Sequence, residues 1–226
     1  LKTPSPGTGI QKTGPVTTPR LDSGKAVETT PPAALEKQPV YRELFLDGLI
    51  DEEQPVLKEL PGASEYILEL TLSDDYAALA GQQTVRYTNR ENTPLEEIYF
   101  RLFANTAGGS SLVSNVTVDG EVVQPGYEFE KSAVRLPLPS ALPVGSTVEI
   151  ELDFRVSIPE EMGGNYGLFG FFEGVLVLDE FYPVIPVYDN EGWNVQAPPP
   201  NADTSYFDMS FYLVSVSAPA DLVMAA

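Results

Sequence analysis

The chain has 226 residues, of which 42% are hydrophobic, so it can form one substantial domain with a buried core. Its formal net charge of −20 argues against binding to nucleic acids or anionic lipid, because phosphate groups would be repelled. The sequence contains no histidine and no cysteine. This absence excludes disulfides and Ser-His or Cys-His nucleophilic catalysis, and it leaves only carboxylates to bind zinc.

Residues 1–40 are rich in Pro, Thr and Gly, contain no aromatic residue, and are predicted to form an extended linker or arm. The arm has five Lys/Arg and three Asp/Glu, a net charge of +2, which leaves −22 for residues 41–226. One interpretation is a stalk of the kind that follows a secretion signal. The other is an arm that docks on an acidic body, its own or that of a neighbouring copy. The apolar residues available for docking are Ile10, Val16, Leu21 and Val27.

Residues 41–62 are predicted to form a short helical or irregular connector. An apolar cluster around Phe45 is expected to pack this connector against the body, and Pro61-Gly62 then breaks the chain. No apolar run approaches the roughly 20 residues that a membrane helix needs, so no membrane insertion is expected.

From Tyr66 onward the hydrophobic pattern has a period of two, which is typical of half-buried strands. The stretches YILELTL, QQTVRYTNR and EEIYFRL each alternate in this way. Asp119-Gly120 supplies the positive φ values of a type I′ turn and predicts a hairpin. The clearest strand is STVEIELDFRVSI, with one apolar and one mostly acidic face. Residues 63–226 are therefore predicted to be an all-β domain, an antiparallel β-sandwich.

The last two apolar stretches are also predicted to be strands. FDMSFYLVSVSAP is apolar on both faces, which favours a central position in a sheet. DLVMAA reads as a further strand that stops without a turn, so the chain is expected to come from a longer protein.

An aromatic stretch over residues 166–193 suits either a surface that grips a partner or a seam between two sheets. Pro183 and Pro186 place residues 181–188 at a sheet edge or outside the sheet, because proline cannot donate to a ladder. The residues expected to face a cleft or a partner are Tyr182, Pro186, Tyr188, Asp189, Trp193, Asp179 and Glu180. Three of these rings could form a carbohydrate-stacking platform, namely Tyr182, Tyr188 and Trp193. Calcium stays open as a cofactor because the chain has 33 acidic side chains, but nothing is spaced like a calcium-binding loop.

Several passages, taken in order, resemble the N-terminal domain of the M1 family of zinc metallopeptidases. They are TVRYTNRENTPLEEIYFRLFAN, the VDG hairpin, LPLPSALPVGSTVEIELDF, YP-x-x-x-x-YD-x-x-GW and YFDMSFYLVSVSAPADLVMAA. The resemblance covers about residues 60–226. Pro186, Tyr188 and Asp189 match the family's Pro-x-Trp/Tyr-Asp element, while the Glu-Pro that commonly follows is replaced by Asn190-Glu191.

The resemblance implies a β-sandwich that packs on a thermolysin-like catalytic domain and helps to wall off its cleft. In that family the catalytic domain carries His-Glu-x-x-His and binds zinc, so zinc is expected only in a domain that this chain lacks. The family position for a Gln or Glu that binds the substrate amine falls near Val175, where neither residue occurs. Asp179 and Glu180 are the nearby carboxylates that could substitute.

The sequence thus predicts a non-catalytic domain of an exported M1-type metallopeptidase-like protein, located outside the cell or on its surface. This domain is expected to have no catalytic residues, metal ligands or cofactor of its own, and its expected partner is its own catalytic domain or another protein chain. Two alternatives remain open. One is a cell-surface assembly subunit that forms homo-oligomers through the arm, and the other is a carbohydrate-binding or surface-binding β-sandwich.

Overall fold

The computed structural model describes residues 42–162, 167–197 and 206–225. The chain divides into two units, Leu1–Gln38 and Pro39–Ala226, and every described residue belongs to the second. The predicted arm therefore lies outside the described residues, together with its candidate docking residues Ile10, Val16, Leu21 and Val27. No helix in the described part of the chain is long and apolar enough to cross a membrane.

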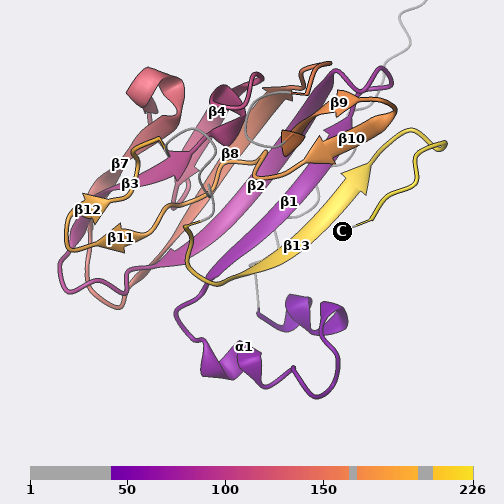
Figure 1. Ribbon diagram of the computed structural model, residues 1–226. Coiled ribbons are helices and arrows are strands. Elements are labelled where there is room, and N and C mark those ends of the chain that lie inside the picture. The colour runs from indigo at the N-terminus through magenta and orange to yellow at the C-terminus, as the bar shows by residue number, and fades with distance from the viewer. Residues whose placement is uncertain (1–41, 163–166, 198–205, 226) are drawn as a thin grey trace, which may run out of the picture. The chain divides into compact units, whose positions relative to one another are not determined.

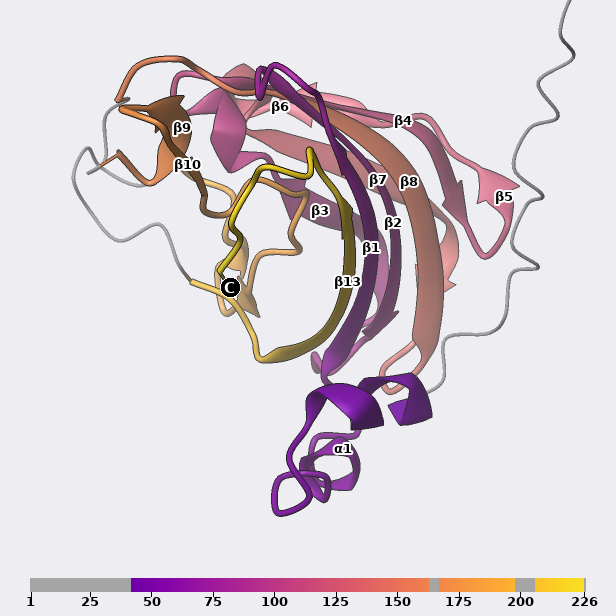
Figure 2. The same ribbon diagram turned by 90° about the vertical axis from the view of Figure 1, so that its right-hand side faces the viewer.

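The larger layer of the described unit is a six-stranded sheet (Figure 1). Its strands, in spatial order, are β13 (Ser210–Ser217), β1 (Ser64–Leu72), β2 (Ala78–Thr88), β8 (Thr147–Ser157), β4 (Ser110–Val118) and β5 (Glu121–Val122). Each neighbouring pair is antiparallel except β13 and β1, which run parallel. Figure 2 shows that this sheet is curved.

Smaller sheets form the second layer. One is three-stranded, in the order β3 (Leu95–Arg101), β7 (Ala133–Leu142) and β6 (Gly126–Glu128). Two are hairpins, β9 (Phe169–Phe172) with β10 (Val175–Leu178), and β11 (Tyr188–Asp189) with β12 (Gly192–Trp193). The short helices are η1 (Arg42–Gly48), α1 (Val56–Glu59), η2 (Phe103–Asn105) and η3 (Phe129–Lys131). The predicted all-β, mainly antiparallel fold is confirmed.

The alternating strands bury their apolar face between the two layers. On β8 the buried residues are those predicted from the alternation, Val148, Ile150, Leu152, Phe154 and Val156. They join Val85 of β2 and, from the smaller sheet, Ile98, Phe100 and Leu136 in one core cluster. At each of these positions a fully buried aliphatic or aromatic side chain contributes about 1.5–3 kcal/mol relative to exposure.

Glycine determines the local backbone arrangement at two places, the Asp119-Gly120 turn and Gly81 in β2. Asp119 and Gly120 both have positive φ (48° and 80°) and connect β4 to β5, so the predicted hairpin is confirmed. Gly81 lies within β2, opposite Phe154 of β8, and a Cβ added there would lie 2.2 Å from the Phe154 ring. The large ring therefore requires glycine across from it.

The positions of the last two apolar stretches differ from those predicted. The strand β13 is at the edge of the large sheet and pairs on one side only with β1, so the prediction of a central strand is wrong. Residues 222–225, predicted to form a strand, follow a turn at Ala220-Asp221 and form none. A strand with apolar residues on both faces can therefore lie at the edge of a sheet, as β13 does.

The connector between residues 42 and 63 is tied to the body as predicted. Phe45 of η1 is buried and packs with Leu57 of α1, and its ring lies 5.8 Å from that of Phe211 in β13. Arg42 donates from Nε to the buried carboxylate of Glu65 (2.7 Å), and its Nη1 and Nη2 donate to backbone carbonyls of the connector. A second arginine, Arg86, also donates to Glu65, at 3.2 Å.

Candidate interaction surface

The aromatic segment of residues 181–197 follows the edge of strand β3 and joins the two layers. Apart from the β11–β12 hairpin within it, its ladder contact in the described part of the chain is the bridge between Val184 and Arg101, with N···O distances of 2.7 and 3.2 Å. On the other side, Gln83 of β2 donates to the Pro183 carbonyl (2.8 Å), and the Ile185 amide donates to the Tyr66 hydroxyl (3.1 Å). The segment therefore lies at a sheet edge, where its prolines break no ladder.

The rings expected to form a stacking platform face the interior of the unit. Tyr188 and Trp193 meet edge to face, with ring centroids 5.1 Å apart and planes at 84°. Trp193 also contacts the rings of Tyr87 and Tyr99, with centroids 6.0 and 6.3 Å away. Tyr182 is partly buried against the same core. These rings are not coplanar, so their geometry favours a seam between sheets over a carbohydrate platform.

The predicted polar candidates lie in turns. Asp179 is exposed, while Glu180 is half-buried and has a positive φ of 48°, and both follow strand β10. Asp189 accepts a hydrogen bond from the Glu191 amide (2.8 Å) and thereby closes the turn between β11 and β12. Pro186 is buried. Of the seven predicted residues, Tyr182 and Pro186 lie in the seam, Tyr188, Asp189 and Trp193 form one hairpin, and the two remaining acids follow another.

A cluster of tyrosines connects this seam to the edge strand β13. The rings of Tyr66 and Tyr212 are stacked, 4.9 Å apart at 17°, and Tyr182 meets each of them edge to face. Burial raises the pKa of all three phenols above the ordinary value, so all three remain protonated at neutral pH. Tyr66 is buried throughout, whereas Tyr212 has a desolvated hydroxyl but keeps 40% of its residue surface exposed.

Beside this cluster the core face of the large sheet is left uncovered. In the parallel register Tyr212, Val214 and Val216 of β13 pair with Tyr66, Leu68 and Leu70 of β1, and paired residues point to the same face. The three β1 residues are buried, but their β13 partners are exposed, and Val214 has 47% of its surface accessible. We call Tyr212, Val214 and Val216 the β13 surface.

The absence of charged residues in this part of the sequence indicates the β13 surface. No charged residue occurs between Met209 and Ala220, in a chain whose body is strongly acidic. Natural edge strands usually carry charges, prolines or bulges that prevent further pairing. An uncharged edge strand with apolar residues on both faces therefore indicates a surface that something covers.

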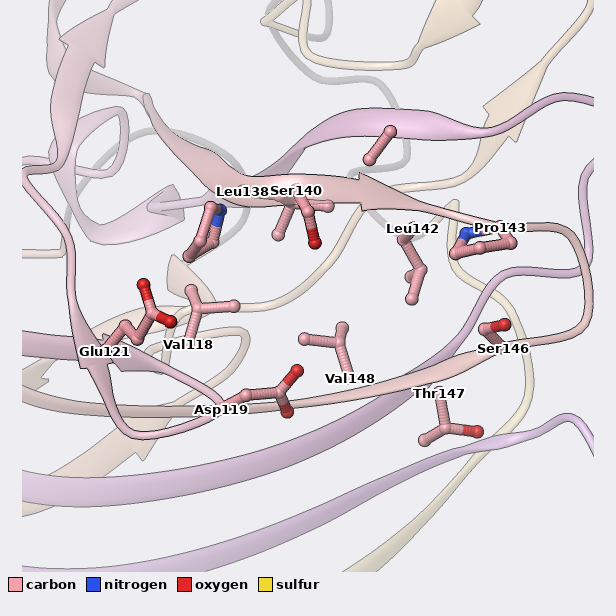
Figure 3. Close-up of a pocket in the computed structure, with 12 residues that line it drawn as sticks. Val118, Asp119, Glu121, Leu138, Ser140, Leu142, Pro143, Ser146, Thr147 and Val148 are labelled. Carbon is pink, nitrogen blue, oxygen red and sulfur yellow. The ribbon is translucent and has the colours of Figure 1, made fainter.

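Figure 3 shows a hollow lined by residues from the β4–β5 turn, the end of β7 and the start of β8. The hollow has a volume of about 270 Å³ and a mixed lining whose apolar residues include Val118, Leu142 and Val148. Of the acids that line it, Asp119 already accepts a hydrogen bond from the Glu149 amide (2.9 Å), and Glu121 is exposed. The acids that line the hollow are thus a turn cap and an exposed side chain, which is not the convergent polar set of a built ligand site.

Among the described residues, no group of three or more His, Cys, Asp or Glu side chains could hold a metal ion. The full sequence contains neither imidazole nor thiol. The residues present therefore do not fit the zinc centre that the M1 resemblance places in a catalytic domain.

The buried phenol of Tyr99 gives a pH-dependent prediction. Burial and a hydrogen bond to Glu128 (3.1 Å) raise its pKa to about 12. An unfolded tyrosine loses its proton near pH 10, so the folded state retains the proton over this interval. The free energy of unfolding is therefore expected to fall as the pH rises from about 10 to about 12. Urea denaturation over this range, with Tyr99→Phe expected to reduce the fall, checks this; a slope that Tyr99→Phe leaves unchanged would contradict it.

The comparisons with known proteins find likenesses among solved structures. No family model and no curated protein sequence matches the chain. The structure is similar to an M1 zinc metallopeptidase from Deinococcus radiodurans, with 27% identity and a TM-score of 0.37 over 46% of this chain and 21% of that one. A mutant of the Deinococcus enzyme bound to a Tyr-Ser-Ala substrate matches with 21% identity and a TM-score of 0.42, over 70% and 32% of the two chains. The chain resembles M1 zinc metallopeptidases.

A further match is a two-domain M1 zinc metallopeptidase mutant bound to L-arginine, with 22% identity and a TM-score of 0.44, over 70% of this chain and 32% of that chain. This is the family that the sequence passages predict. The chain spans about a fifth to a third of the length of these enzymes. These partial superpositions assign no role to any residue, and the ligands named for those proteins belong to them.

Proposed function

We propose that this chain is a non-catalytic β-domain of an exported M1-type metallopeptidase-like protein, and that it packs on or gates a peptidase domain. The observation that carries the proposal is the β13 surface. There the face that elsewhere forms the core continues onto an edge strand and is exposed. Covering such an apolar surface with a partner is favourable by about 25 cal/mol for each Å² removed from water.

The charge distribution supports the same proposal. The acidic body keeps the unit soluble and repels other acidic surfaces, while the stretch from Met209 to Ala220 carries no charge. The centre of a protein interface is depleted in charged residues and enriched in aromatic ones. The β13 surface, with Tyr212 beside Val214, has this composition.

The amino-acid composition of this chain indicates which domain would bind zinc. A zinc peptidase needs imidazole ligands to hold its metal and polarise water, and this chain has no histidine. Zinc and its chemistry would therefore belong to the partner domain. The contribution of this chain would be to position that domain and to limit access to its cleft.

The experiment compares this 226-residue chain with the complete polypeptide encoded by the native reading frame. That frame is expected to contain a His-Glu-x-x-His motif outside these residues. Amide hydrogen exchange over residues 210–217 is expected to be slower in the complete polypeptide, because the β13 surface is then covered. The proposal fails if the exchange rates are equal or if the isolated chain hydrolyses aminoacyl substrates.

A further inference from the structure

Arg101 is a buried arginine at the end of strand β3, with only 4% of its surface exposed. Its Nη1 donates to the backbone carbonyls of Gln196 (2.9 Å) and Asn194 (3.3 Å). The guanidinium carbon lies 4.5 Å from the centre of the Phe103 ring, which covers one face of the group. These contacts fasten the segment after Trp193 to the smaller sheet.

On one edge of the guanidinium, the N–H groups have no hydrogen-bond partner among the described residues. Nε and Nη2 are buried, and neither has a hydrogen-bond partner among the residues that the structure describes. These two nitrogens lie on the same edge, with parallel N–H bonds, which is the fork that binds one anion in a bidentate manner. Both missing partners thus point to a single acceptor.

The charge of Arg101 needs compensation as well. A guanidinium stays protonated in proteins, and a buried ion that lacks a partner is destabilising by several kcal/mol. The ion pairs between described residues join Arg42, Arg86 and Arg135 to glutamates and do not include Arg101. Two carbonyl dipoles, a ring face and the electrostatic attraction of Glu180 compensate only part of a full positive charge, because desolvation by burial remains the largest influence on Arg101.

We propose that the free edge of Arg101 binds a small monovalent anion such as chloride, which accepts hydrogen bonds from Nε and Nη2. The bound anion neutralises the guanidinium and holds the Asn194 to Gln196 segment against β3. A single halide can accept both N–H bonds, and its small size suits two nitrogens that are buried. Water could accept the same bonds but would leave the charge in place.

The test compares the protein refolded in sodium chloride and in sodium gluconate at equal ionic strength, because gluconate is too large to reach two buried nitrogens. We expect chloride to raise Tm saturably by about 3 to 6 °C, the shift produced by roughly 1.5 kcal/mol of anion binding in a domain of this size. Arg101→Met is expected to abolish this difference. The matched control is Arg155→Met, which alters an exposed arginine on β8 and is expected to retain the chloride effect.

Two further measurements keep the proposal testable if Arg101→Met does not fold. A crystal of the unaltered protein grown in bromide is expected to show an anomalous peak within hydrogen-bond distance of Nε and Nη2. The second is Glu180→Gln, since the charge of Glu180 is felt at Arg101; this variant is expected to keep its chloride dependence. Equal Tm values in the two salts, no bromide peak at Arg101, or loss of chloride dependence in Glu180→Gln would each overturn the proposal.

Discussion

Replacing Glu65 with alanine is expected to lower the free energy of unfolding by about 3 to 5 kcal/mol, the usual loss when one partner of a buried ion pair is removed. Glu65 is only 5% exposed and accepts hydrogen bonds from both Arg42 (2.7 Å) and Arg86 (3.2 Å). Without its carboxylate, the mostly buried guanidinium of Arg42 keeps only neutral carbonyl acceptors. Urea denaturation of the variant and the parent protein measures the change.

The control for this prediction is Glu97→Ala. Glu97 pairs with Arg135 at 3.0 Å, but both side chains are more than a third exposed, and surface pairs of this kind contribute little to stability. The control variant is expected to unfold at the same urea concentration as the parent within experimental error. If Glu65→Ala behaves like the control, then the ion pair does not anchor the connector.

The second large effect is expected at Tyr66, whose side chain is 1% exposed and lies where β1, β13 and the aromatic segment meet. Tyr66→Ala is expected to cost about 3 to 5 kcal/mol, because it leaves a cavity of aromatic size. Tyr66→Phe is expected to cost about 1 to 3 kcal/mol, because the Ile185 amide loses its acceptor inside the protein. Urea denaturation measures both values.

Near-ultraviolet circular dichroism provides a second measurement on the same variants. Tyr66→Ala is expected to weaken the aromatic signal, because Tyr182 and Tyr212 lose the ring that orders them. Tyr206→Phe, at an exposed position, is the control. Equal stability of Tyr66→Phe and the parent would show that the hydroxyl does not hold the segment.

Much of the fold could be predicted because the pattern that specifies it is local. Alternation along residues 147–157 identifies both the strand and its buried face, and Asp119-Gly120 identifies a turn by backbone chemistry alone. The place of a strand in a sheet depends instead on distant residues. For this reason the two apolar faces of β13 predicted a central strand, although the strand lies at the edge.

The sequence pattern also did not predict which charged residues are buried. Arg101 and Glu65 lie in alternating strands at positions where a charge normally faces water. In the structure, the segment after Trp193 covers Arg101, and Arg42 from the connector covers Glu65. Both covering segments lie outside the strand that carries the charge, so no periodicity within the strand could reveal them. The candidate residues in the aromatic stretch were predicted as a group, but which of them point inward depends on the same distant contacts.

The parallel pairing of β13 with β1 has a consequence for how the protein forms. Ser64 pairs with Ser210, and these residues lie near opposite ends of the described chain. This edge of β1 therefore stays unpaired until nearly all of that chain has been synthesised. Pairings between residues so far apart in sequence close large loops and form slowly. During translation, the nascent protein therefore exposes an unfinished sheet edge until late, and this is the stage at which a chaperone would contribute most.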